Sequence, residues 1–223
     1  MEIWLDTCNI ETINKISQYG ILHGVTTNPT ILAASEQNHK ELVNKLLEIQ
    51  DGPIAIQVTG ETAKDMVKQA IALHGFSDRI LIKIPAIQEG LIAMKILSEQ
   101  EISFLATAVF QPAQAILAAI AGADYIAPYI GRMLDNGIDA FKTLETILKA
   151  YHHYEFKTKI LAAALRSADQ IITCASMGVH AVTLKDSLAS EFIADDKQAI
   201  DCIRNFANKW ETRSSINVAE SIF

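Results

Sequence analysis

The residues that could perform chemistry centre on one lysine, Lys83, inside the apolar run Leu81–Pro85. In a strand, successive side chains point to opposite faces, so Lys83 lies on the face opposite Ile82 and Ile84. An ammonium group that is removed from water loses basicity, and the neutral amine attacks carbonyls to form Schiff bases. The run therefore contains either a nucleophilic lysine in a cavity or a strand-end lysine that reaches solvent.

Polar residues recur at the same phase of the other strand-like runs, on the face opposite the large aliphatic side chains. Near the ends of the runs this face carries Asp6, Thr26, Asn28, Gln57, Thr107, Tyr129 and Arg166, in the company of Trp4, Ala55, Ala127, Ala162 and Ala164. A solvated strand end explains any one of these polar residues. The shared phase predicts instead that they meet in one polar cup around Lys83.

The elements that must position these residues alternate regularly. Strands are expected at Ile3–Asp6, Gly24–Asn28, Ile54–Val58, Ile80–Pro85, Ser103–Val109, Tyr125–Ile130, Lys159–Leu165 and Ala181–Leu184. Helices are expected to begin near Ile10, Pro29, Glu61, Glu89, Pro112, Gly137, Ser167 and Ser187. Eight strand–helix repeats in 223 residues predict an α/β fold, a single-domain (β/α)8 TIM barrel over residues 1–194, with its active site at the C-terminal mouth. An open doubly wound sheet is the alternative, although no GxGxxG motif follows the first strand.

Residues 195–223 form a separate tail. Ile200, Ile203, Phe206 and Trp210 recur at helical spacing and predict an extra C-terminal helix with one apolar stripe. The ring of barrel helices is complete before this helix begins. The stripe is therefore expected to cover part of its own barrel or to dock on another subunit.

Composition excludes several classes of function. A net charge of −7 argues against nucleic acid as a partner. The three cysteines are widely spaced, which predicts a reducing compartment and no disulfides, and the six histidines form no metal-binding spacing. Residues 1–6 already read as a strand, so no signal peptide is expected, and the apolar stretches are too short or too interrupted to span a membrane. We expect a cytoplasmic protein with no metal.

Three motifs in this order resemble the transaldolase family of class I, Schiff-base aldolases, which are α/β barrels. They are Leu5-Asp6-Thr7, Gly24-Val25-Thr26-Thr27-Asn28-Pro29-Thr30 and Ile82-Lys83-Ile84-Pro85. The resemblance continues through Thr107–Phe110, Ala121–Ala123, Ala127–Arg132 and Ile160–Ala164. Gln57 and Tyr129 stand where transaldolases commonly carry glutamate and phenylalanine. At these two positions the chain resembles the short, fructose-6-phosphate aldolase-like branch of the family.

The resemblance implies a role for each residue of the cup. Lys83 would form the Schiff base with the C2 carbonyl of a ketose, so that the C3–C4 bond can break. The other implied catalytic residues are Asp6, Gln57, Thr107 and Tyr129, the last three holding a water that shuttles protons. The implied substrate-binding residues are Thr26, Asn28, Arg132, Ala164 and Arg166, with the two arginines as candidates for the phosphate. No cofactor is implied, and the protein would form a homo-oligomer, a pentamer or decamer.

Two departures from the family pattern affect substrate choice. Ala164 replaces the usual serine, whose hydroxyl can help to bind phosphate, and Ile87 replaces a serine or threonine. The leading interpretation is an aldolase that reversibly cleaves fructose 6-phosphate to dihydroxyacetone and glyceraldehyde 3-phosphate. The alternative is a transaldolase of the pentose phosphate pathway, which transfers the dihydroxyacetone unit between sugar phosphates. Remoter alternatives are an inactive sugar-phosphate-binding barrel and a pyridoxal phosphate enzyme.

Overall fold

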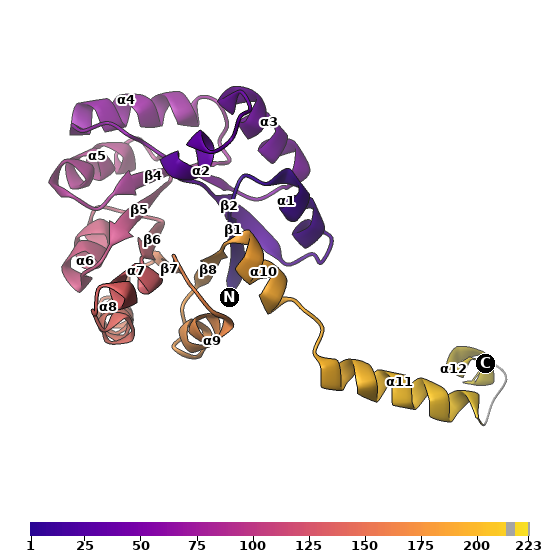
Figure 1. The fold of residues 1–223 in the computed structure, drawn as a ribbon. Coiled ribbons are helices and arrows are strands. Elements are labelled where there is room, and N and C mark those ends of the chain that lie inside the picture. The colour runs from indigo at the N-terminus through magenta and orange to yellow at the C-terminus, as the bar shows by residue number, and fades with distance from the viewer. Residues whose placement is uncertain (213–216, 223) are drawn as a thin grey trace. The chain divides into compact units, whose positions relative to one another are not determined.

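Eight parallel strands close into a barrel, in sequence order from β1 beside β2 round to β8 beside β1 (Figure 1). The computed structural model describes residues 1–212 and 217–222. The strands are β1 (Glu2–Asp6), β2 (Leu22–Thr26), β3 (Ile54–Gln57), β4 (Ile80–Pro85), β5 (Phe104–Val109), β6 (Tyr125–Pro128), β7 (Lys159–Ala162) and β8 (Ala181–Leu184). The predicted (β/α)8 barrel is confirmed, and the open sheet is wrong.

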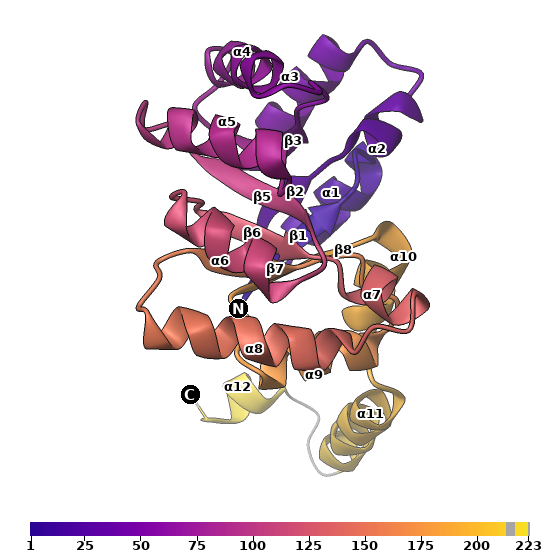
Figure 2. The same cartoon turned by 90° about the vertical axis from the view of Figure 1, so that its left-hand side faces the viewer.

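Helices follow the strands and surround the barrel, and α4 and α5 lie side by side in both views (Figures 1 and 2). The helices of this part are α1 (Ile10–Ser17), α2 (Pro29–Ala33), α3 (His39–Ile49), α4 (Ala63–His74), α5 (Gln88–Ser98), α6 (Pro112–Ile120), α7 (Ile130–Asp135), α8 (Ala140–His153), α9 (Ala168–Ser176) and α10 (Asp186–Phe192). The sequence predicted one helix after the second strand and one after the sixth. The structure has two at each place, and the short helices α2 and α7 directly follow the strand ends.

Four strands end earlier than predicted: β3 by one residue, and β2, β6 and β7 by two or more, each for a local reason. Asn28 does not extend β2 but caps α2, its side-chain oxygen accepting a hydrogen bond from the backbone N–H of Ile31. Tyr129 similarly becomes the residue before α7. After β7, Ala164 adopts a left-handed backbone with φ of 59°, which ends the extended conformation.

The interior of the barrel is filled by side chains that share the phase of Lys83. They are Trp4, Ala55, Leu81, Leu105, Tyr125, Ala127, Leu161, Ala163 and Ala181, with Tyr129 packed against them. For β7 this corrects the predicted phase, because Leu161 and Ala163 point inward in place of Ala162. The register of Leu161 beside Ala181 sets this orientation.

The chain divides into two compact units, Met1–Ala189 and Ser190–Phe223. The second unit contains the end of α10 and the whole of α11 (Lys197–Glu211) and α12 (Val218–Ile222). The expected helix in the tail is therefore present as α11, and its residues Ile203 and Phe206 are 63% and 65% exposed. In the described part of the chain, no helix has the length and hydrophobicity needed to cross a bilayer.

Candidate active site

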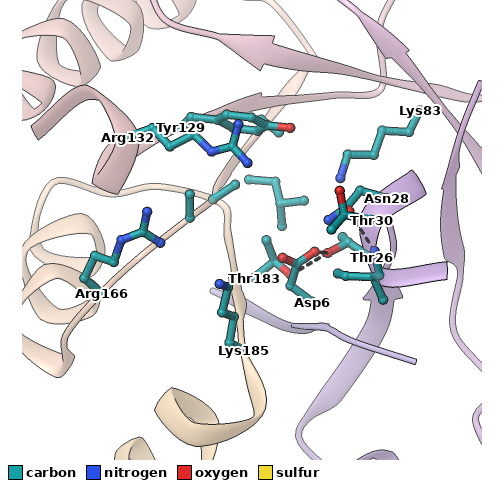
Figure 3. Close-up of a pocket in the computed structure, with 15 residues that line it drawn as sticks. Asp6, Thr26, Asn28, Thr30, Lys83, Tyr129, Arg132, Arg166, Thr183 and Lys185 are labelled. Carbon is teal, nitrogen blue, oxygen red and sulfur yellow. Dashed lines mark hydrogen bonds between the residues drawn. The ribbon is translucent and has the colours of Figure 1, made fainter. Parts of the chain in front are cut away.

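A cavity of about 190 Å³ lies at the C-terminal ends of the strands (Figure 3). Eight of the ten predicted site residues line it, namely Asp6, Thr26, Asn28, Lys83, Tyr129, Arg132, Ala164 and Arg166. They come from the C-terminal halves of five strands, β1, β2, β4, β6 and β7, or from the segments that follow them. Most of the polar residues that strand alternation predicted to share one face therefore lie together at the C-terminal mouth, as expected for a barrel.

Lys83 is buried in the wall of this cavity, with 5% of its surface exposed. Its ammonium group donates a hydrogen bond to the backbone oxygen of Thr27, at 3.0 Å. Burial lowers the pKa of Lys83 below its ordinary value, and the positive charge of Arg132 lowers it further, while the charge of Asp6 acts in the opposite direction. The lysine is thus biased toward the neutral, nucleophilic amine.

Asp6 is held by a chain of hydroxyl groups from neighbouring strands. The Thr26 hydroxyl donates to the Asp6 carboxylate at 2.7 Å and lies 2.8 Å from the hydroxyl of Thr183. An ionised carboxylate can only accept hydrogen bonds, and a hydroxyl has a single hydrogen to donate. The hydroxyl of Thr26 therefore donates its hydrogen to Asp6. Thr183 must then donate to Thr26. The Asp6 carboxylate therefore fixes the direction of the whole chain, in which Thr183 donates to Thr26 and Thr26 donates to Asp6.

The residues proposed to hold a water are only partly together. The hydroxyl groups of Thr107 and Tyr129 lie 2.8 Å apart, and either can donate to the other. Gln57 lies beside Lys83 in the strand register and is half-buried. Neither Gln57 nor Thr107 is among the residues described as lining the cavity. The water held by all three residues stays a prediction.

Two arginines stand at the far side of the cavity from Lys83 (Figure 3). The guanidinium of Arg132 lies over the ring of Tyr129, 4.9 Å from its centroid, and that of Arg166 forms an ion pair with Asp135 at 3.0 Å. The left-handed turn at Ala164 redirects the chain after β7. This turn explains how Arg166 reaches the cavity although the predicted phase of its strand was wrong.

A close backbone contact fixes the start of α7. A Cβ atom added to Gly131 would lie 2.0 Å from the backbone oxygen of Ala164. The backbone N–H of the preceding residue, Ile130, donates to the oxygen of Ala163 at 3.0 Å. Only glycine allows this approach, which places Tyr129 and Arg132 against the turn after β7.

Sequence reasoning missed three polar residues of the cavity, namely Thr30, Thr183 and Lys185. For Thr183 the signal was present, because it lies between Val182 and Leu184 and so faces away from the large aliphatic residues. Lys185 follows at the same phase, just beyond the end of β8. Thr30 lies in the first turn of α2, where strand alternation gives no information.

No group of three or more His, Cys, Asp or Glu side chains among the described residues is arranged to hold a metal ion. Cys8 lies near the mouth and its thiol donates weakly to the backbone oxygen of Ile31, at 3.6 Å. Burial raises the pKa of the Cys8 thiol, with a smaller contribution from the charge of Asp186. The thiol is therefore less reactive than a free cysteine.

Sequence comparisons identify relatives along nearly the whole chain. A family model described as Transaldolase/Fructose-6-phosphate aldolase matches residues 3–221. A probable transaldolase of Clostridium kluyveri is 39% identical over 212 residues, which are 95% of this chain and 98% of that protein. A probable transaldolase of Coprothermobacter proteolyticus is 41% identical over 82% of this chain and 85% of its own length. One from Streptococcus pyogenes is 35% identical over 94% and 98%.

Solved structures resemble the chain in fold. A mandelate oxidase mutant with a monooxide FMN adduct superposes with a TM-score of 0.58 at 12% identity, over 82% of this chain and 63% of that one. At such low identity the similarity concerns the barrel alone.

Proposed function

The chain belongs to the transaldolase/fructose-6-phosphate aldolase family, and from this premise we propose that Lys83 forms a Schiff base with a ketose. The family membership makes it an enzyme of the aldolase or transferase kind. We propose more specifically that it cleaves fructose 6-phosphate reversibly to dihydroxyacetone and glyceraldehyde 3-phosphate. No cofactor takes part in this reaction.

The observation that carries the proposal is the buried Lys83 amine at the wall of a polar cavity. A lysine with a lowered pKa has a larger neutral fraction at neutral pH and is a better nucleophile. Its amine attacks the C2 carbonyl, and loss of water gives an iminium. The proton of the C4 hydroxyl leaves to a base, the C3–C4 bond breaks, and its electron pair moves into the iminium to give an enamine.

Asp6 is the carboxylate that lines the same cavity, and we assign it the proton transfers next to Lys83. Its hydrogen bond from Thr26 holds one oxygen in place and leaves the other for the substrate or a water. The side-chain oxygen of Asn28 already accepts the hydrogen bond that caps α2. Its amide N–H groups are therefore the part that can bind substrate hydroxyls. Arg132 and Arg166 suit the phosphate, because guanidinium groups match its geometry.

The experiment that tests the proposal is reductive trapping. Borohydride with dihydroxyacetone or fructose 6-phosphate is expected to leave a reduced adduct on Lys83, located by mass mapping. Lys83→Met should form no adduct, and the same reaction with Lys149→Met, an exposed residue of α8, serves as control. An adduct on another lysine with Lys83 unmodified refutes the assignment.

The second candidate function is transaldolase, which the names of the relatives favour. The two functions differ in the fate of the enamine, which either takes a proton and is hydrolysed or waits for a second aldehyde. The Tyr129 hydroxyl, paired with Thr107, can orient a proton-donating water and favours hydrolysis.

Tyr129→Phe tests this distinction. General acid–base assistance is typically worth about 10²–10⁴ in rate, so the variant is expected to lose most release of free dihydroxyacetone and to gain, relatively, transfer to erythrose 4-phosphate. Both reactions are to be assayed on both proteins. A wild-type protein that transfers efficiently and releases almost nothing would be a transaldolase.

The substrates named here are sugar phosphates and small ketones or aldehydes, and neither nucleic acid nor a membrane is a partner in the proposal. We propose a cytoplasmic homo-oligomer, a pentamer or decamer, in which the tail contacts a neighbouring subunit; of its residues 195–223, residues 213–216 and 223 lie outside the described part. The odd number and wide spacing of the three cysteines support a reducing compartment.

A further inference from the structure

A third cation, Lys185, lines the cavity from the end of β8. Figure 3 shows its side chain reaching into the cavity, in the same region as Thr183 and Asp6. Because Lys185 lies two residues beyond Thr183, the strand alternation places both on the inward face. Its position is therefore set by the same strand that supplies the hydroxyl chain to Asp6.

The charges of the cavity are unbalanced. Asp6 is the one carboxylate among the described residues that line it, against Lys185, Arg132 and Arg166, even with the buried Lys83 counted as a neutral amine. Arg166 is already paired with Asp135, which lies outside the lining. In the described part of the chain, the ammonium of Lys185 has no carboxylate within 4 Å, the distance that defines the other ion pairs. An unpaired cation beside other cations favours a ligand with more than one negative charge.

The wall beside the arginines lacks a side-chain hydroxyl at one position. Ala164 lines the cavity next to Arg166 but has no hydroxyl. Arg166 divides its charge between the cavity and Asp135. A phosphate dianion that approached Arg132 and Arg166 alone would leave some of its oxygens without a charged donor, and the ammonium of Lys185, just after β8, can supply one.

We propose that Lys185 is a specificity-determining residue that binds the phosphate of the aldehyde half of the substrate together with Arg132 and Arg166. This inference rests on the proposed function for its substrate and adds β8 to the binding site. It assigns to the enzyme a preference for aldehydes that end in a phosphate monoester dianion over neutral aldehydes of the same length.

The test compares Lys185→Met with Lys185→Arg, since methionine keeps most of the stem and arginine keeps the charge. Each variant is assayed for addition of dihydroxyacetone to glyceraldehyde 3-phosphate and to glyceraldehyde. The ratio of the two kcat/KM values is expected to fall about 10-fold or more in Lys185→Met, as for the loss of one hydrogen bond to a charged group. In Lys185→Arg this ratio should stay close to the wild-type value. In Lys149→Met, the surface control, it should be unchanged.

A second measurement does not depend on turnover. Inorganic phosphate, titrated calorimetrically, is expected to bind Lys185→Met about 10-fold more weakly than wild type. An unchanged selectivity ratio and unchanged phosphate affinity in Lys185→Met would overturn the role of Lys185. Failure of the proposed function looks different, because wild type would then yield neither a borohydride adduct on Lys83 nor an aldol product, while the phosphate titration still decides the role of Lys185.

Discussion

At the scale of single residues, the reactivity of Lys83 is set by two opposing charges and by burial. Burial and Arg132 favour the neutral amine, and Asp6 favours the ammonium. For a lysine with a lowered pKa, the neutral fraction rises as pH passes through that lowered value, below the range of a free lysine. Schiff-base formation is therefore expected to begin at a lower pH than with a solvent-exposed amine.

Substitution of the two charges should move this pH dependence in opposite directions. Arg132→Met removes a repelling charge, so the pKa of Lys83 rises and its labelling by trace acetic anhydride at neutral pH slows severalfold. Asp6→Asn removes an attracting charge, so the pKa falls further and labelling speeds up severalfold. Peptide mapping measures both rates, with exposed Lys149 as internal reference. A shift of both variants in the same direction would contradict the electrostatic account.

Thr183 is expected to act on catalysis through Asp6. Thr183→Val keeps the shape but removes the hydrogen that Thr183 gives to Thr26, so the Asp6 carboxylate is less firmly oriented. The kcat for fructose 6-phosphate cleavage should fall about 3- to 10-fold, as for the loss of one neutral hydrogen bond. Thr183→Ser should restore it, and KM should change less than kcat. Thr158→Val, at another buried threonine, is the control, and an equal loss there would point to a general structural effect.

At the scale of elements, the sequence predicted the inward face of a strand correctly where neighbouring side chains differ strongly in polarity or size. Lys83 between two isoleucines and Thr107 between alanines on an apolar strand gave the correct inward phase. On β7 the run of three alanines, residues 162–164, has no contrast in polarity or size, so the phase assigned to Ala162 was wrong. The left-handed Ala164 and the pairing of Thr107 with Tyr129 depend on contacts between strands, which one chain segment read alone does not contain.

Gly131 joins two elements of the site, and its substitution should disturb both. In Gly131→Ala the new Cβ would meet the backbone oxygen of Ala164, so the start of α7 must move away from the end of β7. We expect a loss of about 1–3 kcal/mol in the free energy of unfolding, as for other overpacked sites, and weaker binding of inorganic phosphate. Denaturant titration measures the first.

Gly75→Ala is the matched control. Gly75 has a right-handed helical backbone at the end of α4, and its nearest contact for a Cβ is the oxygen of Ile71 at 3.3 Å. A change within about 1 kcal/mol is expected there. Equal destabilisation by both substitutions would argue against the contact with Ala164 as the cause.

At the scale of the whole molecule, α11 presents apolar side chains on an exposed face. Ile203 and Phe206 are both largely exposed and lie one turn apart, so together they form an apolar patch. Such a patch commonly marks a contact with another chain. We expect light scattering to find the wild type well above 24.5 kDa and Phe206→Asp closer to that monomer mass. Asn208→Asp, on the same helix, adds the same charge on nearly the opposite side from Phe206 and serves as control. A monomeric wild-type protein would refute the proposal.

The filled lower half of the barrel also has a kinetic consequence. Leu81 and Trp4 occupy the interior below Lys83, and at the N-terminal end Glu2 accepts hydrogen bonds from Trp4 at 3.1 Å, Tyr125 at 3.0 Å and Lys159 at 2.6 Å. Substrates can then enter and leave only past the strand ends. In the proposed reaction the aldehyde half, bound nearer the arginines, departs first, while the dihydroxyacetone half stays attached to Lys83. An incoming acceptor occupies the place just vacated, so transfer would follow double-displacement kinetics, and excess acceptor would compete with the first substrate for the unmodified enzyme.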